Sequence, residues 1–309
     1  MGDRVGALMT LFTLSRMYHV DIYFRWCEDP SVMNAQADGL QQRPRQTGFN
    51  YSQEEFERRF VPPQLTHMKI VSSEFVAQNS GFLQNMSRVK YETSEAGLDQ
   101  VYTTASKYIK VYDFQDHSNF IQNYRVVARL VHVYALKNNF KIMVRDPPFY
   151  LVIHMHAGDI DDDGHPSAYC TSTVVREVIQ TFWPFGSLKK FFVISNNQTR
   201  ARSILRRYTH ALDFLEAHVS GNLDYNDFAL LLGASGIIQH ANYGWSSYSN
   251  TPAMIASVPL IATYNWPTRF DTIRQHGALP LEFYECGTLD AFVERLRQKY
   301  AMYDEDDLD

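Results

Sequence analysis

The sequence predicts an α/β protein of two domains, the second built around a parallel β-sheet. From residue 149 onward, short apolar runs of strand length alternate with longer segments that have helical periodicity. This alternation is typical of βαβ units, whose strands lie parallel. The length of 309 residues agrees with two domains, because one domain usually spans about 100–200 residues.

Composition and charge exclude some classes of function. A hydrophobic content of 45% and a charged content of 20% are ordinary for a globular chain with a full core. The net charge of −5, with no sustained basic face, argues against nucleic-acid binding as the main role. One arginine group has the spacing of the outer face of a helix, or of a site for an anionic ligand. It comprises Arg200, Arg202, Arg206 and Arg207.

The cysteines and the apolar runs bear on the compartment. Cys27, Cys170 and Cys286 are far apart and form no Cys-x-x-Cys pair, so we expect reduced thiols and no disulfide framework. No stretch approaches 18 uncharged apolar residues, and the N-terminus has no signal-peptide core. These features predict a soluble protein of the cytoplasm, or a domain excised from an anchored protein.

The first 26 residues predict a glycine loop, a helix and a strand. Gly2 and Gly6 would let the backbone turn before a helix that runs to Tyr18, and the free N–H groups of that helix could hold an anion. Residues 29–67 are irregular apart from one helical piece over 53–60, and residues 67–73 suit a strand. Residues 74–117 give no clear pattern.

A boundary between domains is expected near a pair of prolines. Apolar periodicity predicts a helix over 118–139, and residues 140–144 suit a strand. Pro147 and Pro148 then read as a connection. We therefore predict an N-terminal α/β domain over residues 1–145 and a second domain over 146–309.

The most informative stretch runs from Phe149 to His165. Its first five residues are apolar and predict a strand buried on both faces, ending at Ile153. Small and charged residues follow at once, and we expect them to form a loop at the carboxyl end of that strand. They comprise His154, His156, Asp159, Asp161, Asp162 and Asp163. In open α/β sheets this is the edge at which ligands bind.

The second half continues with the same alternation. Helices are predicted near residues 172–181, 199–208, 224–234, 250–257 and 289–303, and strands near 189–195, 212–217, 236–240 and 259–264. Polar clusters follow two of these strands as well, namely residues 195–197 (Ser-Asn-Asn) and the loop 242–249. Because the carboxyl ends of parallel strands share one edge, the three clusters could converge on one crevice.

Two helix starts have more than one interpretation. Ser246, Ser247 and Ser249 precede or open a helix, where they could cap it or cradle a diphosphate together with free backbone N–H groups. Asp224 and Asp227 open another helix. Either they cap it, or one carboxylate accepts the N1–H and 2-amino hydrogens of a guanine.

These motifs resemble those of the GDP-fucose-dependent fucosyltransferases, of the α1,2-, α1,6- and protein-O-fucosyl types. Residues 153–159 (Ile-His-Met-His-Ala-Gly-Asp) are similar to the His-x-Arg-x-Gly-Asp motif of that family. Residues 192–197 look like its second motif, a strand ending in Ser/Thr-Asp-Asp. Residues 227–249 resemble its third motif, a helix, a strand and a Ser-Phe-Ser-type loop, and residues 2–8 resemble its glycine-rich first loop.

The resemblance implies a GT-B-like fold, with two Rossmann-like domains facing a central cleft. It implies an inverting glycosyltransferase that moves L-fucose from GDP-fucose, held mainly by the C-terminal domain, to a hydroxyl of an oligosaccharide or glycoprotein, without a metal or other cofactor. It sets His154 beside the nucleotide, Asp227 on guanine, and Ser246 and Ser247 on the diphosphate. The further substrate-binding residues that it implies are Gly2, Arg4, Asp159, Asn196, Asn197, Tyr243, Gly244, Trp245 and Ser249.

The sequence departs from the family motif at His156. The family has an arginine there, paired with the diphosphate of the leaving GDP, and arginine is always charged and bidentate whereas histidine is not. A protonated His156 could stabilise the departing diphosphate, or Arg4 or Arg145 could replace it. The pair Asn196 and Asn197 stands where the family has acids, which fits the loss of an arginine partner.

An inverting transfer needs a base that deprotonates the acceptor hydroxyl. Asp161, Asp162 and Asp163 are the candidates, because adjacent acids repel one another and the pKa of one rises toward the useful range. A solvated acidic turn is the other interpretation.

Two rival functions fit the same residues. Asp161 and Asp163 could be the Asp-x-Asp of a metal-dependent glycosyltransferase, with the metal bridging a UDP-sugar. A catalytically lapsed carbohydrate-binding protein would also show a degraded motif, such as histidine in place of arginine.

Overall fold

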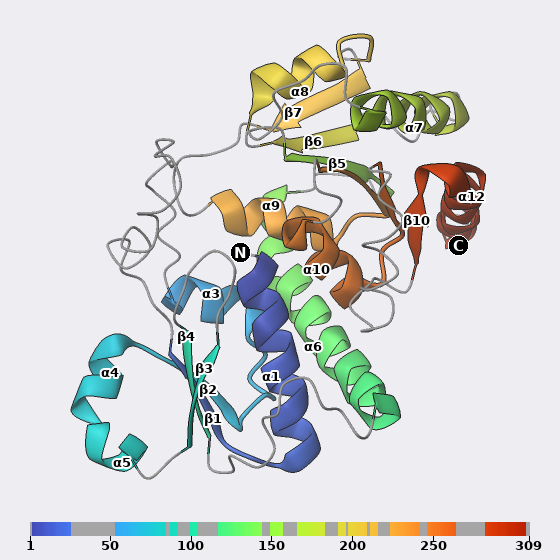
Figure 1. Cartoon of the computed structure of the whole chain (residues 1–309). Helices are drawn as coiled ribbons and strands as arrows, with labels where there is room; N and C mark the ends of the chain where they lie inside the picture. The colour runs from blue at the N-terminus through green and yellow to red at the C-terminus, as the bar shows by residue number, and fades with distance from the viewer. Residues whose placement is uncertain are drawn as a thin grey trace. The chain divides into compact units, whose positions relative to one another are not determined.

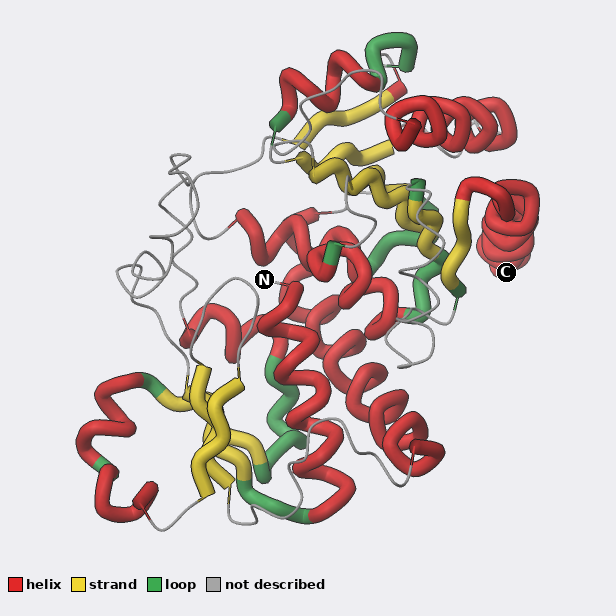
Figure 2. The backbone as a smooth tube through the Cα atoms, in the orientation of Figure 1, coloured by secondary structure: helices red, strands yellow, loops and turns green. Residues whose placement is uncertain are grey.

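A computed structural model gives the structure of the protein. It describes residues 2–25, 53–84, 87–91, 99–103, 117–143, 149–156, 166–182, 191–195, 197–208, 211–215, 223–241, 246–263 and 282–306. The chain divides into two compact units, the first made of residues 3–139 with 219–225 and the second of residues 140–218 with 226–309. Each unit contains its own β-sheet (Figures 1 and 2).

The sheet of the first unit is mixed, with strand order β2-β1-β4-β3. Its strands are β1 (Ile22–Arg25), β2 (Met68–Val71), β3 (Ser87–Tyr91) and β4 (Asp99–Thr103). β1 runs parallel to β2 and antiparallel to β4, which also pairs antiparallel with β3. The β3–β4 pair lies within residues 74–117, where the sequence pattern predicted no element.

The first helix corrects one expectation. α1 runs over Gly2–Tyr18, so Gly2 and Gly6 lie inside the helix and form no loop before it. The apolar pattern explains this, because buried apolar residues recur at helical spacing from the first turns onward, at Val5, Leu8 and Phe12. The helix ends where His19 adopts a left-handed conformation, with φ of 50°.

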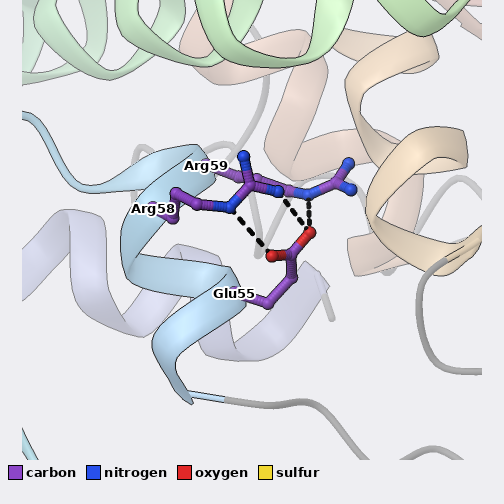
Figure 3. Close-up of polar contacts among 3 residues, drawn as sticks. All are labelled: Glu55, Arg58 and Arg59. Atoms are coloured by element: carbon purple, nitrogen blue, oxygen red, sulfur yellow. Dashed lines mark hydrogen bonds and ion pairs between the residues drawn. The ribbon is translucent and has the colours of Figure 1, made fainter.

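The short helix α3 (Gln53–Phe60) matches the prediction at both ends. Phe56 and Phe60, one turn apart, are both buried. The Glu55 carboxylate pairs with the exposed Arg58 at 2.6 Å and also with Arg59, which is buried (Figure 3). The hydrogen bond from Arg58 is the main reason why the pKa of Glu55 is lowered, and Arg59 adds to it.

Three helices complete the described part of the first unit. α4 (Ser73–Gln78) is capped by Ser72, whose side chain accepts from the Phe75 N–H, and α5 (Ser80–Gln84) follows. α6 runs over His117–Met143, so the strand expected at 140–144 is wrong up to Met143. No proline or glycine interrupts the helix before residue 147, and lysine and methionine are good helix formers.

The second unit contains a six-stranded parallel sheet, which confirms the predicted α/β class. Its strands are β5 (Leu151–His156), β6 (Phe191–Ser195), β7 (Leu212–Leu215), β8 (Gly236–Ala241), β9 (Leu260–Ala262) and β10 (Phe283–Glu285). The order across the sheet is β10-β9-β8-β5-β6-β7, and every pair is parallel. This is the doubly wound order 3-2-1-4-5-6, which reverses direction between β5 and β8.

Helices cover both faces of this sheet (Figure 1). They are α7 (Pro166–Phe182), α8 (Gln198–Ile204), α9 (Leu223–Leu232), α10 (Ser247–Ala256) and α12 (Leu289–Asp306). Alternate residues of β5 divide between two cores. Leu151 and Ile153 pack with residues of α7, α8 and α12, whereas Tyr150 and Val152 pack with residues of α9 and α10. His154, two residues after Val152, therefore lies on the α9 and α10 face.

One glycine is required where α12 packs on this sheet. A Cβ on Gly236 would lie 2.6 Å from Leu296 Cδ2 and 2.8 Å from Leu151 Cδ2. Both neighbours are fully buried in one core. The glycine therefore permits a close approach that any side chain would block.

Two element ends near the expected site also differ from prediction. β5 continues to His156, so His154 and His156 belong to the strand and not to the loop after it. α10 begins at Ser247, so the polar loop ends at Ser246, and the helix ends before Ser257, which is left-handed with φ of 52°. The backbone explains both differences. The polar end of β5 stays paired with β8 as far as His156, and the N–H groups of Ser249 and Asn250 bond the Ser246 carbonyl as the first turn of α10.

The cysteines correct a further expectation. Cys170 of α7 and Cys286 of the 3₁₀ helix η4 (Cys286–Thr288) form a disulfide, with their Cα atoms 6.3 Å apart. They are 116 positions apart in the sequence, and β10, which η4 follows directly, went unpredicted. The sequence therefore gave no signal that these thiols meet. Cys27 lies outside the described residues.

Candidate functional site at the carboxyl edge of the parallel sheet

The candidate site lies where the strand order of the second unit reverses. β5 and β8 are neighbours in the sheet, and His154 is paired in register with Gln239. The helix that follows β8, α10, starts within the same region. Open α/β sheets bind ligands at this kind of switch point, outside the carboxyl ends of the strands.

Three side chains form a buried hydrogen-bonded chain at this point. His154 is 5% exposed, and its Nδ1 lies 3.0 Å from the hydroxyl of Ser249. The Gln239 amide donates from Nε2 to the same hydroxyl at 2.6 Å and to the Ser246 carbonyl at 3.1 Å. The chain links β5 and β8 to the first turn of α10.

The donors and acceptors of this chain indicate one tautomer of His154. Gln239 supplies a hydrogen to the Ser249 oxygen, so the serine hydrogen points elsewhere. Its two acceptors are His154 Nδ1 at 3.0 Å and the Ser246 carbonyl at 3.4 Å, of which the histidine is closer. We infer that Nδ1 accepts and that Nε2 carries the hydrogen.

A second buried amide lies next to this chain. Asn250, in the first turn of α10, is 1% exposed. Within the described ranges, neither its side-chain nitrogen nor its oxygen has a hydrogen-bond partner, and the same holds for Gln239 Oε1. A buried polar atom without a partner costs about 1–3 kcal/mol. The Asn250 amide and Gln239 Oε1 could therefore form hydrogen bonds with a ligand at this edge of the sheet.

The start of α10 is open. Its N-cap residue Ser246 makes no side-chain cap hydrogen bond, unlike Ser72 of α4 and Asn197 of α8, whose side chains both cap. The capping interpretation therefore fails for the Ser246 hydroxyl. A helix start carries about half a positive charge and is a place where anions bind.

Aromatic rings line the same face. The ring of Tyr248 lies 5.4 Å from that of His154 and 5.9 Å from that of Phe228. Phe228 belongs to α9, next to Asp227, which is 7% exposed. Asp227 is the fifth residue of α9, too far into the helix for an N-cap. The capping interpretation is therefore wrong for Asp227.

The polar cluster after β6, of which Ser195 and Asn197 are described, caps a helix. Ser195 is buried, and its hydroxyl accepts from the Asn197 N–H at 3.1 Å. The Asn197 side chain in turn caps α8 by accepting from the Arg200 N–H at 3.0 Å. The first and third clusters thus meet at β5 and β8, while this one forms a helix cap at the end of β6.

The remaining predicted residues fall into two groups. His156 ends β5, opposite Ala241 in register, and Gly2, Arg4 and Ser247 lie in helices. The others lie outside the described residues and comprise Arg145, Asp159, Asp161, Asp162, Asp163, Asn196, Tyr243, Gly244 and Trp245. Their predicted roles stay predictions.

The opposite face of β8 carries a second polar network that the sequence did not reveal. His240 is fully buried, and its Nδ1 lies 2.6 Å from the Thr171 hydroxyl. That hydroxyl is also 2.7 Å from Thr263, which donates to the Gln239 carbonyl at 3.1 Å. Thr171 follows the disulfide residue Cys170, so the network and the disulfide hold the start of α7 to the sheet.

Sequence reasoning missed Gln239 and Asn250. Gln239 offered a signal, because it interrupts the apolar run Gly-Ile-Ile at a position expected to be buried. A polar residue at such a position needs a partner, and here it has Ser249. Asn250 offered none, since an asparagine near a helix start is ordinarily read as solvent-exposed.

The described residues contain neither a cluster of metal ligands nor a membrane-spanning helix. No group of three or more His, Cys, Asp or Glu among them could hold a metal ion. No helix in the described ranges is long and apolar enough to cross a membrane. Asp159, Asp161, Asp162 and Asp163 lie outside these ranges.

Comparison with known proteins assigns no family. No family model matches the sequence, and no curated protein matches it. Among solved structures, the chain is similar to the E. coli heptosyltransferase WaaC with ADP, at a TM-score of 0.36 and 13% sequence identity. The match covers 60% of this chain and 58% of that chain. The likeness is too low for an argument about activity.

Proposed function

We propose that the protein is an inverting glycosyltransferase whose second unit binds a nucleotide-sugar donor, GDP-fucose, at the junction of β5, β8 and α10. One observation carries the proposal. The side chains of His154, Ser249 and Gln239 are hydrogen-bonded in series where the strand order of the sheet reverses, beside the start of α10, whose N-cap residue makes no side-chain cap hydrogen bond. The sequence motifs that resemble the fucosyltransferases supply the donor and the reaction class.

The diphosphate is proposed to bind at the start of α10. The positive end of the helix attracts an anion, a contribution of about 0.3–1 kcal/mol that can reach ~2 kcal/mol when partly buried. Ser246, with no cap hydrogen bond of its own, and the Asn250 amide can donate to phosphate or ribose oxygens. Ser249 is fully buried and already bonded, so it acts as a positioning residue and not as a phosphate ligand.

Asp227 is proposed to read the guanine. A carboxylate that accepts both the N1–H and the 2-amino hydrogen distinguishes guanine from uracil, which lacks that pair of donors. Asp227 is buried, and the next residue of α9, Phe228, contacts Tyr248 near His154. A base stacked on such rings would gain apolar contact as well as the hydrogen bonds.

The transfer itself would leave GDP and the fucosylated acceptor with inverted configuration. One of Asp161, Asp162 and Asp163 takes the proton of the acceptor hydroxyl as its oxygen attacks the anomeric carbon. The bond from that carbon to the diphosphate breaks with both electrons going to GDP. His156, or Arg145, compensates the charge that develops on the diphosphate.

Calorimetric titration of the whole chain with GDP, UDP, GDP-fucose and GDP-mannose tests the proposal. GDP and GDP-fucose are expected to bind, with and without EDTA, and UDP to bind at least tenfold more weakly. A preference for UDP that is lost in EDTA would refute the metal-free reading and favour an Asp161-x-Asp163 metal site. Failure of every nucleotide to bind would leave the lapsed carbohydrate-binding protein.

Two variants separate recognition from folding. Asp227→Asn keeps the shape of the side chain and is expected to weaken GDP at least tenfold while leaving UDP within twofold. Arg176→Gln alters an exposed charge on α7 and serves as its control. Equal GDP affinity in Asp227→Asn and the wild type would remove Asp227 from guanine recognition.

A further inference from the structure

The first unit contains a cavity that the proposed function does not use. Its volume is about 500 Å³, and it is lined by the end of α1, residues 64–68 and the first turns of α6. This volume is typical of sites for small molecules. Ile22 and Met68 begin the parallel strands β1 and β2, so the cavity lies at the amino ends of these strands.

One part of the cavity wall is basic. Arg16, in the last turn of α1, and the rings of His19 and His67 line it, and the two ring centroids are 6.4 Å apart. His67 Nδ1 lies 3.1 Å from an oxygen of Asp21. That carboxylate orients the ring and leaves Nε2 as the nitrogen that can meet a ligand.

The backbone presents one of these histidines at a cost. His19 is left-handed, with φ of 50°, a conformation that costs a residue with a side chain about 1–2 kcal/mol. A left-handed residue directly after the last turn is a common way for a helix to end. Here it ends α1 and brings the imidazole of His19 to the wall of the cavity.

The rest of the wall is neutral and polar over an apolar base. Gln64, Asn119 and Asn123 supply amides, and the Asn123 nitrogen donates to the Asn119 carbonyl at 3.0 Å. Phe12 and Met68 are buried beneath them. None of the described lining residues is acidic.

From these observations we infer that the cavity binds a small polyhydroxylated molecule with one anionic group, a sugar acid or a sugar phosphate. Arg16 and the two imidazoles receive the anion. The described lining residues include no carboxylate, and Asp21, which is not a lining residue, contacts Nδ1 of His67. The amides of Gln64 and Asn119 bond the hydroxyls. The inference is independent of the nucleotide site, because every lining residue belongs to the first unit.

Titration of the whole chain with glucose 6-phosphate, glucuronate and glucose tests this inference. At least one of the two anions is expected to bind saturably and at least tenfold more tightly than glucose. Arg16→Ala should weaken that anion at least tenfold. Arg129→Ala, an exposed arginine on α6 outside the cavity, should leave its Kd within twofold.

Loss of anion binding to this cavity can be distinguished from loss of nucleotide binding to the second unit. GDP binding, measured on the same samples, should be the same in Arg16→Ala and the wild type. His67→Gln provides a second variant if Arg16→Ala loses its melting transition. Absence of saturable binding by both anions, equal binding of glucose, or equal losses in the two arginine variants would overturn the inference. Which anion binds decides between the phosphate and the carboxylate.

Discussion

Removing the Cys170–Cys286 disulfide is expected to lower the free energy of unfolding by about 3–5 kcal/mol. The two cysteines are 116 residues apart, and the chain-entropy relation for a loop of that length gives ~4.8 kcal/mol at 25 °C. Losses on removing a native disulfide are about 2–5 kcal/mol in practice. For a protein of this size, the loss corresponds to a fall in melting temperature of about 5–8 °C.

Denaturant unfolding of Cys170→Ser/Cys286→Ser measures this loss, and Cys27→Ser is the matched control. The wild type should lose the same stability in dithiothreitol, whereas the double variant should not respond to it. Thiol titration of the denatured, unreduced wild type should give one reactive thiol. Three thiols, or equal stability of the double variant and the wild type, would refute the disulfide and restore the expectation of reduced cysteines.

Three further predictions concern packing, the site and pH. Gly236→Ala should lower the free energy of unfolding by about 1–3 kcal/mol, because a Cβ there overlaps buried side chains. Gly81→Ala, whose Cβ would have nothing within 4 Å, is the control and should leave that free energy nearly unchanged. Chemical unfolding measures both. Ser249→Ala should weaken GDP binding about tenfold and, by removing the partner of Nδ1, change the His154 tautomer seen by ¹⁵N NMR; an unchanged tautomer would contradict the inferred hydrogen-bond direction. The pKa of Glu55 is lowered in the folded state, chiefly by the hydrogen bond from an arginine of α3, so its contribution is present above the unfolded pKa and lost as the pH falls through the folded one. The stability of the wild type relative to Glu55→Gln, about 0.5–1 kcal/mol at pH 7, should therefore begin to fall below the unfolded pKa of about 4.3 and be lost once the pH is below the lowered folded pKa.

The sequence predicted most elements of the second unit because buried parallel strands and amphipathic helices have distinct patterns. β6, β7 and β9 all lie within their predicted ranges, and β8 extends one residue beyond its own, to Ala241. β10 was missed because glutamates at 282 and 285 leave no apolar run to mark it, whereas β9, which is equally short, is an apolar run of three residues. The expected strand at 140–144 failed for the opposite reason, since a short apolar run that continues a helix looks like a strand.

The candidate site was predictable only in part, because its main contacts join distant residues. His154 and Ser249 were both singled out from local chemistry, yet they are 95 residues apart and no spacing rule connects them. Gln239 and Asn250 gain their meaning only from burial, which a single polar residue in a sequence does not reveal. Tertiary placement therefore decided which polar residues share a site.

The disulfide bears on the compartment in which the protein works. Disulfides persist in oxidising compartments and are rare in the cytosol, where thiols are kept reduced. The expectation of a cytoplasmic protein came from an odd and scattered set of cysteines. Because two of them are bonded to each other, the structure favours an oxidising compartment. The thiol titration therefore tests the location as well as the bond.

Strand order explains why only two of the three polar clusters converge. The sequence argument held that all carboxyl ends of parallel strands share one edge, which is true of β5, β6 and β8 alike. However, the helices that follow neighbouring strands pack on one face of the sheet until the strand order reverses. Only between β5 and β8 do the two following connections run to opposite faces, and this leaves a crevice between them. β6 lies on the far side of β5 from β8, and its polar cluster caps α8. The same reasoning predicts that replacing Ser195 or Asn197 by alanine will lower stability more than nucleotide affinity.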